Sequence, residues 1–337
     1  MNKIIRIGTR ESQLAVWQAT QVKDLLAASG YQSELTYIKS EGDIDLKTPL
    51  YEMGVQGIFT RSLDIALLND KIDIAVHSMK DVPTQLPEGI VQAAVLKRGN
   101  YKDVFVPHPD LADSKEVFQQ GIVKTEELTF ITGPKGKRKI TVTDTGPMIN
   151  AIIATSSVRR KAQWLNRYPS HTIESLRGNV NTRLRKLKES NWHGAIFAAA
   201  GLERINLLPE NSVELDWMLP APAQGAIMIV CREDDSYSFE SCEEFNDAET
   251  ALCTKIERDF LRTLMGGCTT PISAFAETIE DEIHFKGNIL SLNGKMIASV
   301  GVQTPIIMAE NIGVEAATNL LKDGGKRIAD SIRDAGK

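Results

Sequence analysis

Short apolar stretches alternate with amphipathic ones along the first 230 residues of the chain. The stretches at 4–7, 72–76, 151–154 and 195–200 are rich in apolar residues, and polar residues or glycine follow each of them. After the first stretch, residues 14–25 place apolar side chains at helical spacing. Strands that alternate with helices in this way predict α/β units that include parallel strands.

The last 90 residues follow a different pattern. Residues 248–264 have the spacing of one long helix, and three strand-like stretches follow at 272–277, 282–290 and 295–303. A final helix is predicted at about 311–321. Strands that are grouped together and flanked by helices predict a separate small α+β domain.

Polar side chains gather where the predicted strands of the first part end. In an open α/β sheet, ligands bind in the crevice beyond the carboxyl ends of the strands. We therefore expect the side chains at these ends to meet in one site. They are Arg10, Lys80, Asp81, Ser156, Ser157, Arg159, Arg160 and Arg204.

A second polar segment lies at 175–183. Apolar spacing predicts that a helix begins near Asn179, and the preceding Gly178 allows a ligand close to the backbone. Arg177 and Arg183 flank this helix start and are suited to binding carboxylates or phosphates in a bidentate manner. Each arginine taken alone fits a weak surface ion pair equally well. All six arginines together favour a ligand with several carboxylates.

Asp81 and His77 lie at the end of one predicted strand. Asp81 either pairs with Lys80 and caps a turn, or it transfers protons and stabilises a developing cation. His77 is expected to be a partly buried histidine whose hydrogen bonds are satisfied.

Composition mainly excludes classes of partner. The 337 residues are 42% apolar and 25% charged, with a formal net charge of -5. No positive field covers the whole protein, so we expect no nucleic-acid partner, and an anion site must depend on local arginines. No apolar run approaches about 18 residues, and the first residues lack the apolar core of a signal peptide. We expect a cytoplasmic protein without a membrane span.

One cysteine stands apart from the others. The four cysteines are at 231, 242, 253 and 268. They show no C-x-x-C spacing, so we expect reduced thiols, no disulfides and no metal site. Cys268 follows Gly266-Gly267 and precedes Pro271, which places its thiol on a tight turn. It is either a buried small side chain, as most unpaired cysteines are, or a thiol presented to a ligand.

Several of these segments resemble one family. The segment 257–273 is similar to the cofactor-attachment signature of the porphobilinogen deaminase (hydroxymethylbilane synthase) family. Five further segments resemble the family's other motifs in the same order, over roughly residues 4 to 300. They are 8–12, 75–83, 155–160, 175–180 and 222–226.

The resemblance implies an enzyme, a transferase that condenses four porphobilinogen molecules head to tail. Each condensation releases ammonia, and the product is the linear tetrapyrrole 1-hydroxymethylbilane. The family builds its chain on a dipyrromethane cofactor, which the resemblance attaches to Cys268 by a thioether. It makes Asp81 the catalytic carboxylate, which assists deamination and stabilises positive charge on the pyrrole nitrogens.

The resemblance also assigns binding roles, and it implies no metal. The cofactor would be held by Lys80, Ser156, Ser157, Arg159, Arg160, Arg183 and Arg204. The substrate would be bound by Arg10, Ser12, Gln18 and Arg177. The chemistry agrees with the residue pattern, because every added ring brings two carboxylates that need cations.

The family fold implied is α/β with three domains. Two are lobes like those of type II periplasmic binding proteins, and the third is a small C-terminal α+β domain that carries the cysteine loop. We expect domain 1 at 1–102 with 224–242, domain 2 at 103–223 and domain 3 at 243–337. The family is usually monomeric.

The sequence departs from the family pattern at two places. The segment at about 108–150 is longer than the one that the family usually has before its Thr-Ser-Ser-x-Arg-Arg motif. We expect this insert either to form an extra hairpin on domain 2 or to cover the cleft. Gln56 stands in the loop 53–59 where the family commonly has lysine, so a cationic role of that loop is in doubt.

Two other classes of function fit parts of the pattern. A two-lobed binding protein for a small polycarboxylate would explain the arginines, but it leaves Cys268 without a role and lacks the expected export signal. A cysteine-nucleophile hydrolase would need a base, and His284 is the histidine nearest to Cys268 in sequence.

Overall fold

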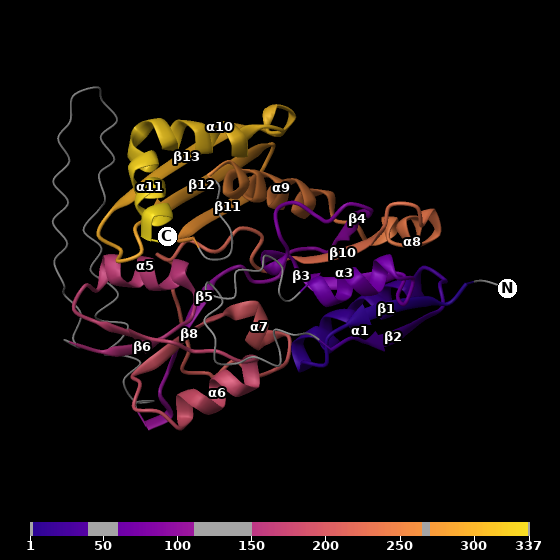
Figure 1. The fold of residues 1–337 in the computed structure, drawn as a ribbon, viewed down its shortest axis with the longest axis horizontal. Helices are drawn as coiled ribbons and strands as arrows, with labels where there is room; N and C mark the ends of the chain where they lie inside the picture. The colour runs from indigo at the N-terminus through magenta and orange to yellow at the C-terminus, as the bar shows by residue number, and fades with distance from the viewer. Residues whose placement is uncertain (1–2, 40–59, 111–149, 265–269, 336–337) are drawn as a thin grey trace.

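The computed structural model describes residues 3–39, 60–110, 150–264 and 270–335. Within them the chain forms two sheets of five strands and one of three. We call the two larger sheets with their helices the first and second lobe, and the remainder the third unit. Figure 1 shows the first lobe mainly in indigo and purple with strand β10 in orange, the second mainly in magenta and pink, and the third unit in orange and yellow.

The first lobe is built on a sheet with the order β2-β1-β3-β10-β4. Its strands are β2 (Ser33–Tyr37), β1 (Ile5–Thr9), β3 (Ile74–Ser78), β10 (Ile227–Arg232) and β4 (Ile90–Val95). Strand β1 runs parallel to both neighbours, whereas β10 is antiparallel to β3 and β4. Helix α1 (Gln13–Ala28) packs its apolar side on one face and α3 (Arg61–Leu68) packs on the other.

The second lobe repeats this arrangement. Its sheet has the order β7-β6-β8-β5-β9. The strands are β7 (Thr172–Glu174), β6 (Ile152–Ala154), β8 (Gly194–Ala198), β5 (Asp103–Pro107) and β9 (Val213–Glu214). Strand β6 is parallel to both neighbours and β5 is antiparallel to β8. The helices are α5 (Val158–Arg167), α6 (Val180–Lys188) and α7 (Ala199–Glu203).

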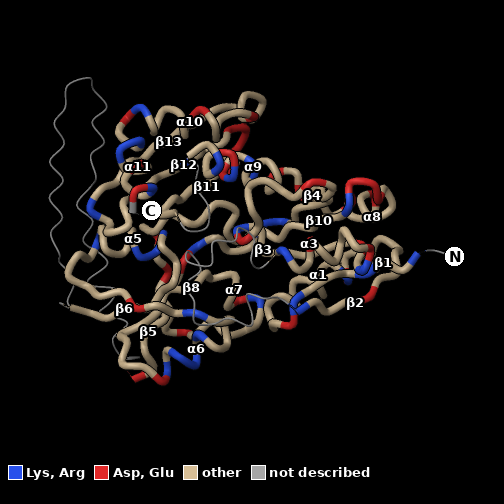
Figure 2. The backbone as a smooth tube through the Cα atoms, viewed as in Figure 1, with Lys and Arg blue, Asp and Glu red and all other residues tan. Residues whose placement is uncertain are grey.

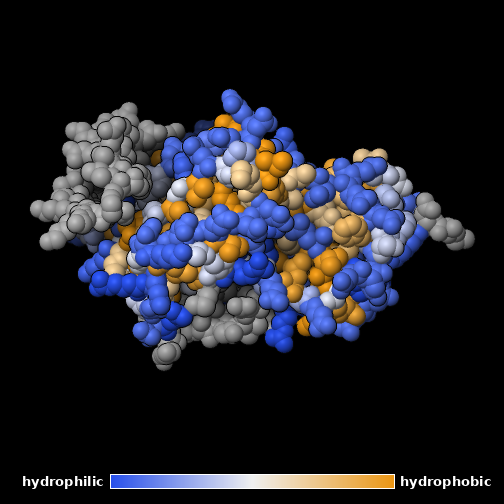
Figure 3. Space-filling view, turned by 90° about the horizontal axis from the view of Figure 1, so that it is seen from above, coloured by the Kyte–Doolittle hydropathy of each residue, from blue (hydrophilic) through white to orange (hydrophobic). Residues whose placement is uncertain are grey.

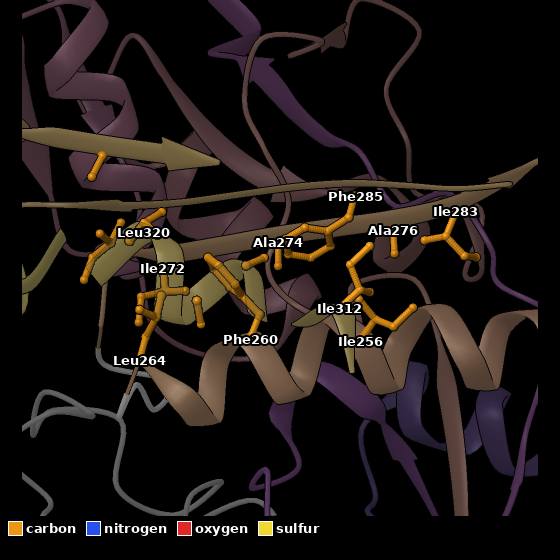
Figure 4. Packing of buried hydrophobic residues seen from close by; sticks show 14 of the residues in the cluster. Ile256, Phe260, Leu264, Ile272, Ala274, Ala276, Ile283, Phe285, Ile312 and Leu320 are labelled. Carbon is orange, nitrogen blue, oxygen red and sulfur yellow. The ribbon is translucent and has the colours of Figure 1, made fainter. Parts of the chain in front are cut away.

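The third unit is an antiparallel sheet of β11 (Ile272–Ile279), β12 (Glu282–Leu290) and β13 (Ile297–Pro305) covered by helices. The helices are α9 (Ala248–Thr263), α10 (Ile312–Leu320) and α11 (Lys326–Ala335). Figure 4 shows Phe260 of α9 packed against Phe285 of β12, with ring centroids 5.1 Å apart. A side chain at Gly287 would meet the Phe260 ring, so a glycine allows helix and sheet to approach this closely.

Short elements complete the chain. They are η1 (Met79–Asp81), α8 (Ser236–Glu240), η3 (Glu243–Phe245), η4 (Ile306–Met308) and η5 (Leu321–Gly325). The first matters most for function, because it follows β3 directly and carries Asp81. Seen from above, the surface is largely hydrophilic with small hydrophobic groups between (Figure 3).

Two connections join the lobes, one between β4 and β5 and one between β9 and β10. They are bonded to each other, because the Gly99 N–H donates to the Gly225 carbonyl at 3.1 Å. Gln224 is fully buried there, and its Nε2 donates to the Tyr101 carbonyl at 2.8 Å and to Asp103 at 2.9 Å. The side chain therefore ties one crossing to the start of the other lobe's sheet.

The predicted fold class is confirmed, with two α/β lobes and a small α+β unit. The long helix predicted at 248–264 is α9, and the three predicted strands are β11, β12 and β13 with shifts of up to two residues. The mainly apolar residues 227–232 form β10, with which the chain returns to the first sheet. Among the described residues, no helix has the length and apolar character that crossing a membrane requires.

Candidate active site where the two lobes meet

The first lobe contributes residues from the ends of β1 and β3. Ser12 is the N-cap of α1, where its hydroxyl accepts a hydrogen bond from the Ala15 N–H. Gln18 is buried on α1, and its Nε2 donates to the Ser78 hydroxyl at 2.9 Å. Ser78 is the last residue of β3. Two predicted substrate-binding residues thus have structural partners that fix the helix beside the strand end.

Lys80 and Asp81 lie together in the short helix η1, directly after β3. Both side chains are partly exposed. The pKa of Lys80 is lowered to about 8, mainly by burial. The Asp81 carboxylate acts to raise this pKa, and the charge of Arg160 acts to lower it. Lys80 is therefore a cation at neutral pH whose proton is held less tightly than that of a surface lysine.

His77 is the residue before Ser78 on β3 and is buried. Burial, together with the charge of Arg10, lowers its pKa to about 3, so the imidazole is neutral. Its Nε2 has no hydrogen-bond partner within the described part of the chain. The expectation of a fully satisfied histidine was therefore wrong, because the buried Nε2 finds no partner among the described residues.

The second lobe contributes residues from the end of β6. Ser157 is the N-cap of α5 and accepts a hydrogen bond from the Arg160 N–H, while the Ser156 hydroxyl lies 3.0 Å from the Ser175 hydroxyl. Serine is a favoured N-cap because its oxygen satisfies one of the free N–H groups of the first turn. The motif thus begins a helix and places Arg159 and Arg160 on that helix's first turn.

Arg159 and Arg160 are both buried around one carboxylate, that of Asp103 at the start of β5. Arg159 Nη2 is 2.7 Å from Asp103 Oδ2, and Arg160 Nη2 is 2.8 Å from Oδ1. Arg159 also donates to the Leu219 carbonyl and Arg160 to the Ile196 carbonyl. Burial raises the pKa of Asp103, but the two arginine charges outweigh it and lower the pKa to about 2.

This cluster carries more positive than negative charge. Asp103 neutralises one of its two arginines, and Arg159 Nε is buried without a hydrogen-bond partner among the described residues. A buried donor without an acceptor destabilises the fold unless a ligand or water pairs with it. The cluster is therefore suited to an anion.

Arg177 and Arg183 flank a glycine turn on the same side of the second lobe. Gly178 has a φ of +115°, in the region that favours glycine, and Asn179 caps α6. Arg183 Nε donates to the Gly178 carbonyl at 2.7 Å. The turn and its carbonyl fix the guanidinium near the helix start.

The electrostatics of Arg183 link the two lobes. Its pKa is lowered to about 10, mainly by burial and also by the charge of Arg160, while the Asp81 carboxylate acts to raise it. Asp81 thus lies within electrostatic reach of an arginine on the other lobe. The lobes also touch directly, since Asn181 Nδ2 of α6 donates to Gln13 Oε1 of α1 at 2.9 Å.

Arg204 lies apart from this group. Its Nη2 donates to the Gly225 carbonyl at 2.7 Å, and its guanidinium lies over the Trp17 ring at 5.6 Å. Burial lowers its pKa to about 10, and the charge that counters burial is that of Glu203. The structure places Arg204 at the connection between the lobes, where it holds the second crossing against α1.

The structure therefore brings six of the predicted site residues together from two lobes. The electrostatic neighbours are Lys80, Asp81, Arg159, Arg160, Arg177 and Arg183. Figure 2 shows Lys and Arg segments along the side where the lobes face each other, near β3 and α7. A group of cations with one carboxylate within reach suits a substrate with several carboxylates and a reaction that passes through positive charge.

Some predictions fall outside the described residues, namely Cys268, Gln56 and most of the insert at 108–150. The two ends of the cysteine loop are described. Helix α9 ends at Thr263 and β11 begins at Ile272. Gln163 of α5 donates to the Ser273 hydroxyl at 3.1 Å. The start of β11 therefore lies against the helix that carries Arg159 and Arg160.

The other three cysteines are buried, free thiols. Burial raises the pKa of Cys231 and Cys253 to about 11 and that of Cys242 to about 12. They are protonated and packed, as expected for structural cysteines. In the described part of the chain, no group of three or more His, Cys, Asp or Glu residues is placed to hold a metal ion.

Sequence reasoning missed the buried groups that orient the site. Asp103 is one, and Glu257 and Arg258 of α9 are two others. Arg98 Nη1 lies 2.6 Å from Glu257 Oε1, and the Ala223 N–H donates to Glu257 Oε2 at 2.6 Å. A charged residue inside an otherwise apolar strand or helix face was the available signal, since buried charges are rare unless paired.

The chain is similar to several known proteins. Solved extracellular solute-binding proteins align with the chain, for example ytmK from Bacillus subtilis at 11% identity over 72% of this chain and 90% of that one, with a TM-score of 0.37. Two family models cover most of the sequence. Residues 5–240 match the porphobilinogen deaminase dipyrromethane cofactor binding domain, and residues 251–322 match the porphobilinogen deaminase C-terminal domain.

Curated relatives match over nearly their whole length. The porphobilinogen deaminase of Trichlorobacter lovleyi is 37% identical over 98% of this chain and 97% of its own. That of Syntrophotalea carbinolica is 36% identical over 97% and 96%, and that of Desulforamulus reducens is 36% identical over 99% of each chain. On the evidence of these family models and relatives, the chain belongs to the porphobilinogen deaminase family.

Proposed function

We propose that this chain is a hydroxymethylbilane synthase in which Asp81 is the catalytic carboxylate and Cys268 is the attachment residue. It condenses four porphobilinogen molecules onto a dipyrromethane primer, releases ammonia at each step and then releases 1-hydroxymethylbilane. The observation that carries the proposal is the position of Asp81, which lies on the first lobe within electrostatic reach of Arg183 on the second.

The charge balance of the site fits the dipyrromethane cofactor. Arg159 and Arg160 share one carboxylate, and Arg159 Nε is buried without an acceptor among the described residues. Pyrrole units that carry acetate and propionate groups supply such acceptors. Lys80, Arg159, Arg160 and Arg183 would hold the cofactor, with Ser156 and Ser157 at the helix start. The cofactor supplies the terminal pyrrole on which the product grows.

Asp81 has the chemistry that this reaction needs. Loss of ammonia from porphobilinogen leaves a cation, and a carboxylate stabilises that charge and exchanges a proton with the leaving group or the pyrrole nitrogen. Lys80 of the same turn and Arg183 of the second lobe lie within electrostatic reach of it. They neutralise the substrate's own carboxylates, which would otherwise compete with Asp81 for the developing positive charge.

The remaining site residues are proposed to act on substrate and cofactor from the edge of the site. Arg10 and Arg177 are proposed to bind substrate carboxylates. Ser12 and Gln18 are proposed to assist, although both already hold α1 in place. Arg204 is proposed to act on the cofactor through the crossing that it stabilises. The monomeric state and the cytoplasmic location stay predictions.

Intact mass spectrometry of the purified protein tests this proposal. We expect the protein to exceed its sequence mass by two linked pyrrole units. The excess should vanish in Cys268→Ser and remain in Cys253→Ser, a matched change at a buried thiol. An unmodified mass in fully active protein would contradict the proposal. An unmodified mass in protein without this activity would instead favour a two-lobed polycarboxylate-binding protein.

A further inference from the structure

Helix α9 of the third unit brings a buried arginine to the turn that carries Asp81. Arg258 is 9% exposed. Its Nη1 donates to the Val82 carbonyl at 3.0 Å and to the Met79 carbonyl at 3.4 Å. Its Nη2 donates to the Pro83 carbonyl at 2.6 Å. The accepting carbonyls lie on both sides of Asp81 along the chain.

The turn has few other main-chain bonds. The Val82 N–H donates to the Met79 carbonyl at 3.1 Å, and the Met79 N–H donates to the Ala226 carbonyl of the second crossing at 3.0 Å. The first bond joins the end of the turn to its beginning, and the second holds only the beginning. A guanidinium presents five donors in a rigid fork, so one buried arginine can hold several carbonyls at fixed positions, whereas an ammonium is a single flexible point charge.

From these contacts we propose that Arg258 is a positioning residue for Asp81. It holds the Met79–Pro83 backbone so that the carboxylate keeps its place relative to the arginines of the second lobe. This inference rests on the catalytic role proposed for Asp81. Arg258 itself acts through the backbone, because its donors are directed at carbonyl groups of the turn.

The position of Arg258 on α9 also relates the Asp81 turn to the segment that contains Cys268. Arg258 lies on α9, which ends at Thr263, and Cys268 follows ten residues after Arg258 in the sequence. The helix that fixes the carboxylate's turn is therefore the same helix that leads into the proposed attachment loop. Arg258 sets the distance between the end of that helix and the catalytic carboxylate.

Kinetics on cofactor-loaded enzyme test the role. In Arg258→Gln we expect the rate of ammonia release at saturating porphobilinogen to fall about tenfold to a hundredfold, as for a catalytic group misplaced by about 1 Å. KM should change by less than about threefold, because the arginines that bind carboxylates are on other elements. Intact mass should show the cofactor still attached.

Asn246→Ala is the matched control. Its Oδ1 accepts from the Val95 N–H at 2.9 Å, so it belongs to the same contact between third unit and first lobe but does not touch the turn. We expect it to retain the wild-type rate. Hydrogen exchange gives a readout besides activity, since the Val82 amide should exchange faster in Arg258→Gln and not in Asn246→Ala.

The outcomes separate the inference from the function on which it rests. An Arg258→Gln enzyme with the rate and the Val82 protection of Asn246→Ala would overturn the positioning role. A wild-type protein without the cofactor mass would instead overturn the proposed function. If the glutamine variant does not fold, Arg258→Lys carries the test, because it keeps the buried charge and should still lose several-fold in rate while binding substrate normally.

Discussion

Single residues divide the site's cations into two groups. Arg159 and Arg160 donate to Asp103 and to main-chain carbonyls, so their main contacts are inside the protein. Lys80 and Arg183 are partly exposed and lie in reach of Asp81. The first group sets the charge and shape of the second lobe's edge, and the second group lies near the Asp81 carboxylate.

The carboxylate of Asp81 is predicted to be needed for chemistry and not for folding. Asp81→Asn keeps the size of the side chain but removes its charge and its proton-accepting ability. We expect the rate of hydroxymethylbilane formation to fall by at least about a hundredfold and the thermal midpoint to stay within a few degrees. A variant with near-normal turnover would remove Asp81 from the mechanism.

Asp103 is predicted to give the protein an acid-sensitive stability. Its pKa is about 2 in the folded protein, below the ordinary value of about 3.9 in an unfolded chain. Its contribution is therefore fully present above about pH 4 and is lost as pH falls through about 2. Asp103→Asn should destabilise by about 3–5 kcal/mol at pH 7, since two buried arginines lose their partner.

Denaturant unfolding at several pH values checks this. The gap between wild type and Asp103→Asn should narrow as the pH falls from 4 towards 2. Asp216→Asn is the control, because Asp216 is a 75% exposed partner of Lys102 and should change stability by less than about 0.5 kcal/mol. A gap that does not depend on pH would show that Asp103 acts by packing and not by charge.

At the scale of elements, local sequence patterns predicted where helices begin, because a helix start depends on neighbouring residues. Ser157 and Asn179 are N-caps in the structure, and the helix after Asn179 begins where the spacing of apolar residues predicted. The partner of Arg159 was not predictable in this way. Asp103 is 56 residues away in sequence, and only the pairing of β5 with β8 brings it beside α5. Strand ends are local signals, whereas buried ion pairs depend on topology.

The same reasoning explains what was missed at Arg258. Its helix was predicted at 248–264 and is present as α9. The contact with the Asp81 turn joins residues 175 to 179 positions apart, between two units whose docking no local pattern describes. The division into domains at 1–102 with 224–242, 103–223 and 243–337 stays a prediction, which the strand membership of the sheets supports.

The crossing between lobes is predicted to tolerate no side chain at Gly225. Its φ is +89°, and a Cβ there would lie 2.7 Å from the Gly99 carbonyl oxygen. Gly30→Ala is the control, since its φ is +85° but nothing lies within 4 Å. We expect Gly30→Ala to lose about 1 kcal/mol from backbone strain, and Gly225→Ala to lose more. Equal losses of unfolding free energy, measured by urea unfolding, would show that the two crossings can separate without loss of stability.

At the scale of the whole molecule, the third unit contacts both lobes. Glu257 and Arg258 of α9 hold the crossings and the Asp81 turn, and Asn166 Nδ2 of α5 donates to the Gly294 carbonyl in the β12–β13 turn at 2.7 Å. A unit bonded to both lobes and to both connections restricts their relative movement. Its position sets the distance between the carboxylate of one lobe and the cations of the other.

The place of β10 in the first sheet also determines the order in which the protein can form during synthesis. Strand β10 lies between β3 and β4, yet it spans residues 227–232. The second sheet needs only residues 103–214. A growing chain can therefore close its second lobe while the first still lacks an interior strand. The N-terminal lobe is completed later than the lobe that follows it, and its open strand edges must wait for the chain to return.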